Sequence, residues 1–340
     1  FGARSQEKIL SGIERFRLHR SRFKISEADQ LIRPLLEYLE EHGGVERIEV
    51  AGSYRRRRET VGDIDLLVIA PDAGSVMEHF VAYPKLARVE MAGDTRGRIA
   101  LMSGLEVDLR ILPRRSYGAA LVYFTGSKEH NIRLRKRAIE RQLRLSEYGV
   151  FRDQGESPGD GDRDPWAGEL VAGGEESEVY SAVDLPWIAP ELREDRGEIE
   201  AAASGSLPDL VQLEQIRGDL QMHSTWSDGK NTIEEMLEGC VAKGYEYFAM
   251  TDHSKALAMT GGLDASRIRQ QWVEIEAIQE RHPEIRILRS QEIDILADGS
   301  LDQDEDILES LDLVVISVHS LFELSEVDQT RRVLKALEHP

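Results

Sequence analysis

The chain has 340 residues, of which 41% are hydrophobic, and it carries a formal net charge of −20. This length allows two or three domains, and the lack of an apolar run of ~20 residues argues against a protein that spans a membrane. A single cysteine, Cys240, excludes an internal disulfide framework and a cysteine-based zinc site, which suits a cytoplasmic protein.

The first expected elements are helical. Residues 1–15, which include Ser11-Gly12, resemble the second half of a helix-hairpin-helix motif, whose turn and helix N-terminus hold DNA phosphate without sequence specificity. A plain amphipathic helix explains these residues equally well. Apolar residues recur at helical spacing through residues 26–43, which predicts a helix packed on a hydrophobic core.

The next segment contains a glycine-serine turn, Gly52-Ser53, between two apolar strands. The second strand follows Gly62 and opens with Asp63 and Asp65, whose side chains point to the same face because they are two residues apart. Converging carboxylates repel each other unless a cation lies between them, and hard oxygen ligands suit Mg²⁺ or Mn²⁺. The turn offers backbone N–H groups and a hydroxyl to a phosphate. The segment therefore predicts a site for a metal-bound triphosphate.

A third acid, Asp108, lies on an alternating strand at residues 107–111, which we expect to pair with residues 98–102 across a tight turn. If this strand lies beside the strand of Asp65, Asp108 joins the cluster. Three carboxylates can hold two metal ions ~4 Å apart, an arrangement that clamps the attacking and leaving oxygens of phosphoryl transfer. The alternative, exposed acids at a strand edge, explains a lone pair of aspartates better than it explains this set.

Residues 123–135 carry a further motif, Tyr123-Phe124-Thr125-Gly126-Ser127 followed by Asn131 and Arg135. Together with the runs at 51–68 and 107–111, this motif resembles the palm and thumb of family X DNA polymerases. The resemblance implies that Asp63 and Asp65 hold both metals, and that Asp108 holds the catalytic metal and helps to deprotonate the primer hydroxyl. It also implies that the tyrosine helps to exclude ribonucleotides. It places a set of residues on the incoming nucleotide: Gly52, Ser53, Arg56, Gly62, Tyr123, Phe124, Gly126 and Asn131. One departure is Arg57, where bacterial members usually carry glycine.

The net charge of −20 argues against binding to nucleic acid, but the basic residues are unevenly distributed along the chain. Residues 125–145 hold seven Lys or Arg against two acids, and residues 55–58 form a second basic cluster. Basic clusters can follow a phosphate backbone, although a solvated helix face gives the same pattern. Beside a triphosphate site the pattern favours DNA. We expect a helix over residues 133–144 to contact it through Arg133, Arg135 and Arg137.

The chain also shows boundaries between segments. Residues 153–178 are rich in Gly, Pro and acids, which predicts an acidic surface insertion in the thumb. Residues 153–200 contain fifteen acids and three Arg, which accounts for much of the net charge. Residues 201–208, composed mainly of Ala and Ser, predict a short linker.

A second group of polar residues follows the linker. Short apolar strands are expected at 248–250, 285–288 and 313–316, separated by helical patterns at 231–243 and 265–281, and polar residues follow the strands. This alternation is typical of β/α barrels, whose sites lie at the carboxyl ends of the strands. One such histidine is usually structural, but several at successive strand ends indicate a site for Mn²⁺, Zn²⁺ or Fe²⁺. The histidines and the glutamate at these positions are His223, His253, Glu292 and His319.

This spacing resembles the polymerase-and-histidinol-phosphatase (PHP) domain, a phosphoesterase barrel that follows family X polymerases in bacteria. The resemblance implies that five residues are metal ligands: His223, Asp228, His253, Glu292 and His319. Gln221 departs from it, because the family has its first histidine ligand there. The sequence also stops at Glu338-His339-Pro340, before the later ligand segments, and we interpret His339 as an exposed helix-end residue. We therefore expect little or no 3′→5′ exonuclease activity.

These patterns predict an α/β multidomain protein with a nucleotidyltransferase-type palm (16–115), a helical thumb (116–200) and an incomplete PHP-type β/α barrel (209–340). The resemblance implies a DNA polymerase that fills short gaps in base excision repair or end joining. Its expected cofactors are Mg²⁺ or Mn²⁺ at the palm and Mn²⁺, Zn²⁺ or Fe²⁺ at the barrel. Its expected partners are gapped or primed DNA and deoxynucleoside triphosphates, with no membrane, for a monomer located at the nucleoid.

Two alternatives stay open. The first is a non-templated nucleotidyltransferase, against which the segment 125–135 argues because it fits a templated pocket. The second is a DNA-binding scaffold with dead catalytic sites and a structural PHP domain. The three intact aspartates argue against the scaffold for the palm, whereas Gln221 argues for it in the barrel.

Overall fold

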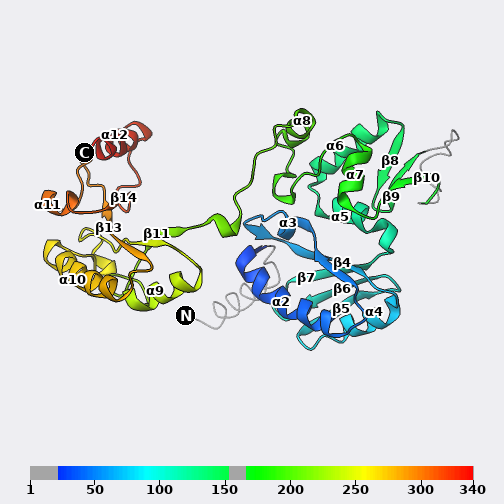
Figure 1. Cartoon of the computed structure of the whole chain (residues 1–340), viewed down its shortest axis with the longest axis horizontal. Coiled ribbons are helices and arrows are strands. Elements are labelled where there is room, and N and C mark those ends of the chain that lie inside the picture. Colours follow the sequence, from blue (N-terminus) through cyan, green and yellow to red (C-terminus); the bar gives the residue numbers. More distant parts are fainter. Residues whose placement is uncertain (1–21, 153–165, 340) are drawn as a thin grey trace, which may run out of the picture. The chain divides into compact units, whose positions relative to one another are not determined.

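The structure, a computed structural model, describes residues 22–152 and 166–339, and the chain divides into two compact units, residues 1–208 and 209–340 (Figure 1). The helix-hairpin-helix prediction for residues 1–15 lies outside the described residues. None of the described helices combines the length and the apolar composition that crossing a membrane requires.

The first unit is built on a five-stranded sheet in the order β2-β4-β7-β6-β5. Its two central strands, β4 (Asp63–Ile69) and β7 (Glu106–Ile111), run parallel, and the other neighbours are antiparallel. The predicted pairing of residues 98–102 with 107–111 is confirmed by the β6–β7 ladder. The remaining strands are β2 (Arg47–Val50), β5 (Leu86–Ala92) and β6 (Arg96–Leu101), and a separate short pair joins β1 (Phe23–Lys24) to β3 (Thr60–Val61).

Helices cover both faces of this sheet. On one face, α2 (Ile25–Glu41) and α4 (Ala73–Val81) share a hydrophobic core with Ile64, Leu66 and Val68 of β4 (Figure 1). On the other face, Leu67 and Ile69 pack with residues of α5 (Tyr117–Thr125). Because side chains alternate along a strand, Asp63 and Asp65 lie on the face that packs against α5.

The segment after β7 is only partly helical. It contains η1 (Arg114–Ser116), α5, α6 (Lys128–Ile139), α7 (Glu176–Ala182), η2 (Pro190–Leu192) and α8 (Glu198–Ser204). It also contains a three-stranded antiparallel sheet in the order β10-β9-β8, formed by β8 (Leu143–Ser146), β9 (Gly149–Arg152) and β10 (Glu169–Ala172).

Two predictions about this segment were wrong in their bounds. The helix predicted over residues 133–144 ends at Ile139, because Gln142 adopts a left-handed φ of 58° and Arg144 lies on β8. The acidic insertion predicted at 153–178 is too long, because β10 and the start of α7 lie within it. The short apolar run Leu170-Val171-Ala172 pairs with β9, a tertiary contact that the surrounding acids concealed. Residues 153–165 of the insertion lie outside the described residues.

The second unit alternates strands and helices. Its parallel sheet has the order β11-β12-β13-β14, and the helical patterns at 231–243 and 265–281 correspond to α9 (Ile233–Ala242) and α10 (Ala265–Arg281). The expected α/β fold with a partial β/α barrel is confirmed. The other elements are η3 (Leu213–Gln215), β11 (Gly218–Met222), β12 (Tyr247–Met250), η4 (Ala258–Thr260), β13 (Arg286–Asp294), α11 (Glu305–Leu308), β14 (Leu313–Ser317) and α12 (Glu326–Leu337).

Candidate active sites

Three carboxylates gather on the α5-facing side of the first sheet. Asp65 lies directly opposite Asp108 in the parallel β4–β7 register, and Asp63 precedes Asp65 by two residues. Asp63 is exposed, whereas Asp108 is buried. Burial and the neighbouring charges of Asp63 and Asp108 raise the pKa of Asp65 to about 6. The cluster is therefore short of positive charge, which a bound cation would supply.

The two oxygens of Asp108 have different environments. Its Oδ2 accepts a hydrogen bond from Arg98 Nη2 at 2.6 Å, while its Oδ1 is buried and has no hydrogen-bond partner. Buried polar atoms are almost always partnered, so an unpartnered carboxylate oxygen across from Asp65 is suited to bind a cation. An all-oxygen donor set suits Mg²⁺ or Mn²⁺.

The glycine-serine turn lies against this cluster. It forms the short helix α3 (Gly52–Arg55), and Gly52 has a φ of +64°. A Cβ atom at Gly52 would lie 2.9 Å from Asp65 Oδ2. Glycine is needed both for the backbone conformation and for the close approach of the turn to the carboxylate. Ser53 follows within α3, and Gly62 separates β3 from β4.

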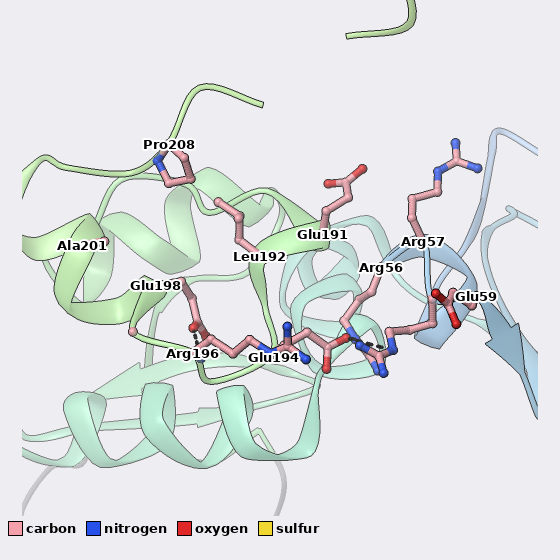
Figure 2. A pocket seen from close by; sticks show the side chains of 12 residues that line it. Arg56, Arg57, Glu59, Glu191, Leu192, Glu194, Arg196, Glu198, Ala201 and Pro208 are labelled. Atoms are coloured by element: carbon pink, nitrogen blue, oxygen red, sulfur yellow. Dashed lines mark hydrogen bonds and ion pairs between the residues drawn. The ribbon is translucent and has the colours of Figure 1, made fainter. Parts of the chain in front are cut away.

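Arg56, one of the predicted triphosphate contacts, is engaged within the protein. Its guanidinium donates to the Thr125 carbonyl oxygen at 2.5 Å and to Glu194 Oε1 at 2.8 Å. It lines a cavity of about 680 Å³ that also contains Arg57, Arg58 and Arg196 (Figure 2). Four glutamates line the same cavity, so its charges are largely balanced: Glu59, Glu191, Glu194 and Glu198.

A buried ion-pair cluster fixes the turn to α7. Arg55 and Arg193 both contact the Glu176 carboxylate, at 2.9 and 2.7 Å, and Trp187 Nε1 donates to it at 3.0 Å. Although burial opposes ionisation, the hydrogen bonds and charges of Arg55 and Arg193 lower the pKa of Glu176 to about 2. This carboxylate is fully partnered, in contrast to Asp108.

The predicted sugar and base contacts lie together at the junction of α5 and α6. Tyr123 and Phe124 meet edge to face with centroids 5.0 Å apart, and Asn131 Nδ2 donates to the Tyr123 carbonyl oxygen at 2.6 Å. Tyr123, Asn131 and Arg135 also line one small cavity. Gly126, at the end of α5, has a φ of +70°.

The three arginines predicted to contact DNA have different surroundings. Arg133 forms ion pairs with Asp195 and Glu200, and Arg137 donates to the carbonyl oxygens of Val183 and Asp184. Arg135 donates only weakly to the Asn131 carbonyl oxygen, at 3.4 Å. Among the contacts within the described residues, those of Arg135 are therefore the weakest of the three.

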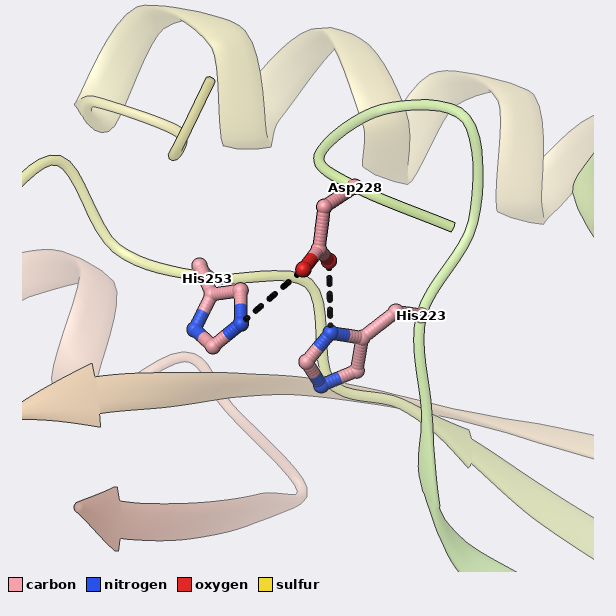
Figure 3. Close-up of side chains that lie close together, drawn as sticks. All are labelled: His223, Asp228 and His253. Atoms are coloured by element: carbon pink, nitrogen blue, oxygen red, sulfur yellow. Dashed lines mark hydrogen bonds and ion pairs between the residues drawn. The ribbon is translucent and has the colours of Figure 1, made fainter. Parts of the chain in front are cut away.

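Imidazoles and carboxylates converge at the carboxyl end of the second sheet. His223 Nδ1 lies 3.0 Å from Asp228 Oδ1, and His253 Nε2 lies 3.7 Å from Asp228 Oδ2 (Figure 3). Donor atoms of these three residues all lie within 4.8 Å of one another. A set of two nitrogens and one oxygen at this spacing could hold a transition metal ion.

A second group shares His253 with the first. Donor atoms of His253, Glu292 and His319 also lie within 4.8 Å of one another, and Glu292 Oε1 lies 3.3 Å from His319 Nε2. His253 Nδ1 is buried without a hydrogen-bond partner, so this nitrogen is also suited to bind a metal ion. Asp294 Oδ1, 3.2 Å from His319 Nδ1, orients that imidazole.

Hydrogen bonds to Asp252 fix the loop that carries His223 and Asp228. This buried carboxylate accepts hydrogen bonds from the backbone and side chain of Ser224, from Ser227 and from Gln271. The loop closes tightly, because a Cβ atom at Gly229 would collide with the His223 carbonyl oxygen. Positions 223 and 228 are therefore fixed by a rigid turn.

Gln221 lies within this cluster. Its Nε2 donates to Glu292 Oε2 at 2.7 Å and lies 3.2 Å from His223 Nε2. An amide nitrogen is no metal ligand, and the hydrogen bond occupies one oxygen of a candidate ligand. Sequence reasoning noted Gln221 but gave no role to Arg98, Asp294 or Glu194. Arg98 could have been found from the expected pairing of its strand with the strand of Asp108, because the two residues lie opposite each other in that register.

Comparisons with known proteins agree with this geometry. Family models match three consecutive segments: the DNA polymerase beta palm at residues 22–94, the DNA polymerase beta thumb at 120–194, and the PHP domain at 219–337. The chain is 39% identical over 339 residues to "DNA polymerase/3'-5' exonuclease PolX" of Bacillus subtilis. The aligned region covers 99% of this chain and 57% of that protein. The chain is therefore similar to bacterial family X DNA polymerases that carry a PHP domain.

More distant relatives match parts of the chain. "Repair DNA polymerase X" of African swine fever virus is 25% identical over 114 residues, 32% of this chain and 65% of that protein. A solved ternary complex of Leishmania infantum polymerase beta is 24% identical with a TM-score of 0.45, over 54% of this chain and 80% of that one. The chain spans 57% of the length of the Bacillus family X protein. Asp63 and Asp65 lie within the segment that matches the palm, and Asp108 lies between the palm and thumb matches. Tyr123 and Asn131 lie within the thumb match, and the histidine cluster lies within the PHP match.

Proposed function

We propose that the chain is a DNA polymerase that transfers a nucleotidyl group from a deoxynucleoside triphosphate to a primer 3′-hydroxyl. The observation that carries this proposal is the alignment of Asp65 with Asp108 across two parallel strands, with Asp63 on the same face and the Gly52 turn against Asp65. The similarity of the palm and thumb to this family supports it.

The roles of the residues follow from their positions. Asp63, Asp65 and Asp108 would hold the ions, and bound Mg²⁺ or Mn²⁺ would supply charge to the attacking and leaving oxygens. Asp108, the most buried of the three, would accept the proton of the primer hydroxyl. Ser53 and Gly62 would bind the triphosphate, and Arg56 would join them by exchanging Glu194 for a phosphate oxygen. Tyr123 and Phe124 would face the sugar, where a 2′-hydroxyl would collide.

Templated synthesis is favoured over non-templated nucleotide addition. Asn131 and Arg135 line one cavity with Tyr123, so groups suited to the base and the template stand next to the sugar contact. The name of the viral relative, "Repair DNA polymerase X", supports gap filling in repair as the biological setting.

Primer extension tests this proposal. The chain is given a one-nucleotide gap, an open primer-template and a single strand, each with Mg²⁺ or Mn²⁺ and all four deoxynucleotides. We expect templated incorporation that is fastest at the gap and lost in Asp108→Ala. Incorporation independent of the template base would favour the non-templated alternative, and none with any substrate would favour the scaffold.

For the PHP domain we propose a metal site with little 3′→5′ exonuclease activity. The name of the Bacillus relative includes that activity. Here the Gln221 amide donates to Glu292 where the family has a histidine ligand, so the site offers one nitrogen ligand fewer. A centre that lacks a ligand binds its metal more weakly, and low occupancy leaves little activated water.

The matching assay is release of mononucleotides from single-stranded DNA with Mn²⁺, Zn²⁺ or Fe²⁺. We expect a rate near that of His253→Ala. Fast release that His253→Ala abolishes would contradict the proposal and show that the site works without the histidine.

A further inference from the structure

Arg98 lies in the palm site, although neither the spacing of the aspartates nor the nucleotide motif points to it. It is on β6, directly opposite Asp108 in the antiparallel β6–β7 ladder. Its Nη2 lies 2.6 Å from Asp108 Oδ2, whereas its Nη1 lies 3.9 Å from Glu106 Oε2. The main ion pair of Arg98 is therefore with the carboxylate expected to accept the primer proton.

This contact divides the two oxygens of Asp108 between two tasks. Oδ2 is held by the guanidinium, and the buried Oδ1 has no hydrogen-bond partner. A carboxylate with one oxygen fixed by a charge-assisted hydrogen bond cannot rotate freely, so the other oxygen keeps one direction. Because the Asp108 side chain is only 4% exposed, water cannot replace the guanidinium on Oδ2.

The contact also compensates charge. Asp63, Asp65 and Asp108 carry up to three negative charges on one face of the sheet, because Asp65 lies opposite Asp108 and two residues after Asp63. The Arg98 guanidinium, 2.6 Å from Asp108, places a positive charge directly against this cluster.

We propose that Arg98 is a positioning residue of the polymerase site: it holds Asp108 Oδ2 and serves as the counter-ion of the aspartate cluster when no metal is bound. The proposal rests on the proposed polymerase function for its kinetic consequence, but its consequence for metal binding does not. Without Arg98, the three carboxylates repel one another more strongly when no metal is bound. Metal binding should therefore stabilise the protein more than it does in the wild type.

The test compares Arg98→Gln with Arg96→Gln in the full chain. Arg96 is the matched control, because it lies on the same strand two residues away but pairs in register with Arg110. The first measurement is the melting temperature with EDTA and with saturating Mg²⁺. We expect a larger metal-induced increase in Arg98→Gln than in wild type, and a wild-type increase in Arg96→Gln. Adding Asp108→Asn should abolish the difference, because the two residues act as a pair.

The second measurement separates kcat from KM on gapped DNA. We expect Arg98→Gln to lower kcat about 10-fold or more without changing the KM of the nucleotide, because a misplaced reacting group costs rate and not binding. Arg98→Lys should recover part of both effects, because it keeps the charge but loses the planar donor pair; it also tests the proposal if Arg98→Gln does not fold.

A metal-induced increase and a kcat equal to those of Arg96→Gln would overturn the proposal. If the wild-type chain does not extend primers, the polymerase proposal fails by itself, and the melting experiment with its Asp108→Asn cycle still decides the role of Arg98.

Discussion

The palm and PHP sites hold their acidic groups in different ways. In the palm, carboxylates face one another within two adjacent strands, and burial with like charges raises the pKa of Asp65. In the PHP domain, each carboxylate faces imidazoles, and the hydrogen bond from His223 lowers the pKa of Asp228. Glu292 lies 3.0 Å from His223 and 3.3 Å from His319. In the mixed cluster the carboxylates have imidazole partners at short distance, whereas the all-oxygen cluster depends on a guanidinium or a metal ion.

The difference predicts that the two sites can be inactivated separately. Asp108→Ala should lower nucleotide incorporation by about 10³-fold or more, because the metal clamp loses its catalytic oxygen. His253→Ala should leave incorporation unchanged. Single-turnover incorporation on gapped DNA measures both variants, with melting curves to confirm folding. Near wild-type incorporation in Asp108→Ala would show that the aspartate cluster is not the polymerase site.

A second prediction concerns a palm–thumb carboxylate that, unlike Asp65, is fully paired. The pKa of Glu176 is about 2 in the folded protein and 4.5 as its ordinary value. Its folded pKa is depressed, so the stabilisation is fully present above pH 4.5 and is lost as the pH falls towards 2. This difference corresponds to on the order of 3 kcal/mol.

Glu176→Gln should therefore lower the free energy of unfolding of the first unit at pH 7 and much less near pH 3. Urea unfolding at the two pH values measures this, with the exposed Glu169→Gln as the control. An equal loss at both pH values would show that packing, and not the charge of Glu176, stabilises this junction.

The third prediction concerns the backbone that supports the all-oxygen cluster. Gly52→Ala should lower incorporation by about 100-fold, because the new Cβ displaces Asp65 and small misplacements in an active site cost about this much. Gly43→Ala is the matched control: Gly43 has a φ of +70°, and a Cβ atom there meets nothing within 4 Å. Both variants should lose similar stability from the left-handed backbone, but only Gly52→Ala should lose activity. Equal kcat values in Gly52→Ala and Gly43→Ala would show that the Gly52 turn does not position Asp65 for catalysis.

The fourth prediction tests whether the PHP site lacks a nitrogen ligand. Gln221→His should raise its affinity for Mn²⁺ by about 10-fold, a typical effect of completing the shell around a metal. Calorimetric titration in Asp65→Asn, which removes the palm site, isolates this binding, and mononucleotide release should rise in parallel. Unchanged affinity would mean that Gln221 already serves the metal as well as an imidazole.

The smallest expected effect concerns DNA binding by α6. Arg135→Gln should reduce the slope of log K against log salt by about 1, because one phosphate contact is lost. Arg137→Gln should change it less, since Arg137 already donates to the carbonyl oxygens of Val183 and Asp184. Fluorescence anisotropy on gapped DNA at several salt concentrations gives both slopes. A larger change for Arg137 would reverse the order that the structure indicates.

Local sequence determined much of this protein. Period-two alternation put Asp63, Asp65 and Asp108 on strands, and helical periodicity predicted α2, α9 and α10. Both signals are contained in a few consecutive residues, so neither needs knowledge of a distant partner. The histidines at strand ends were found in the same way.

Only the tertiary structure decided which groups meet. Arg98 reaches Asp108 because β6 and β7 pair in one register, and a shift of one residue would turn Arg98 to the other face. Glu194 engages Arg56 across 138 residues of sequence, a contact that no local pattern encodes. The strand β10 exists because Leu170 pairs with Phe151, although the surrounding composition predicts a loop. Long-range pairing fixes such contacts because it satisfies backbone hydrogen bonds and charges that no neighbour in sequence can reach.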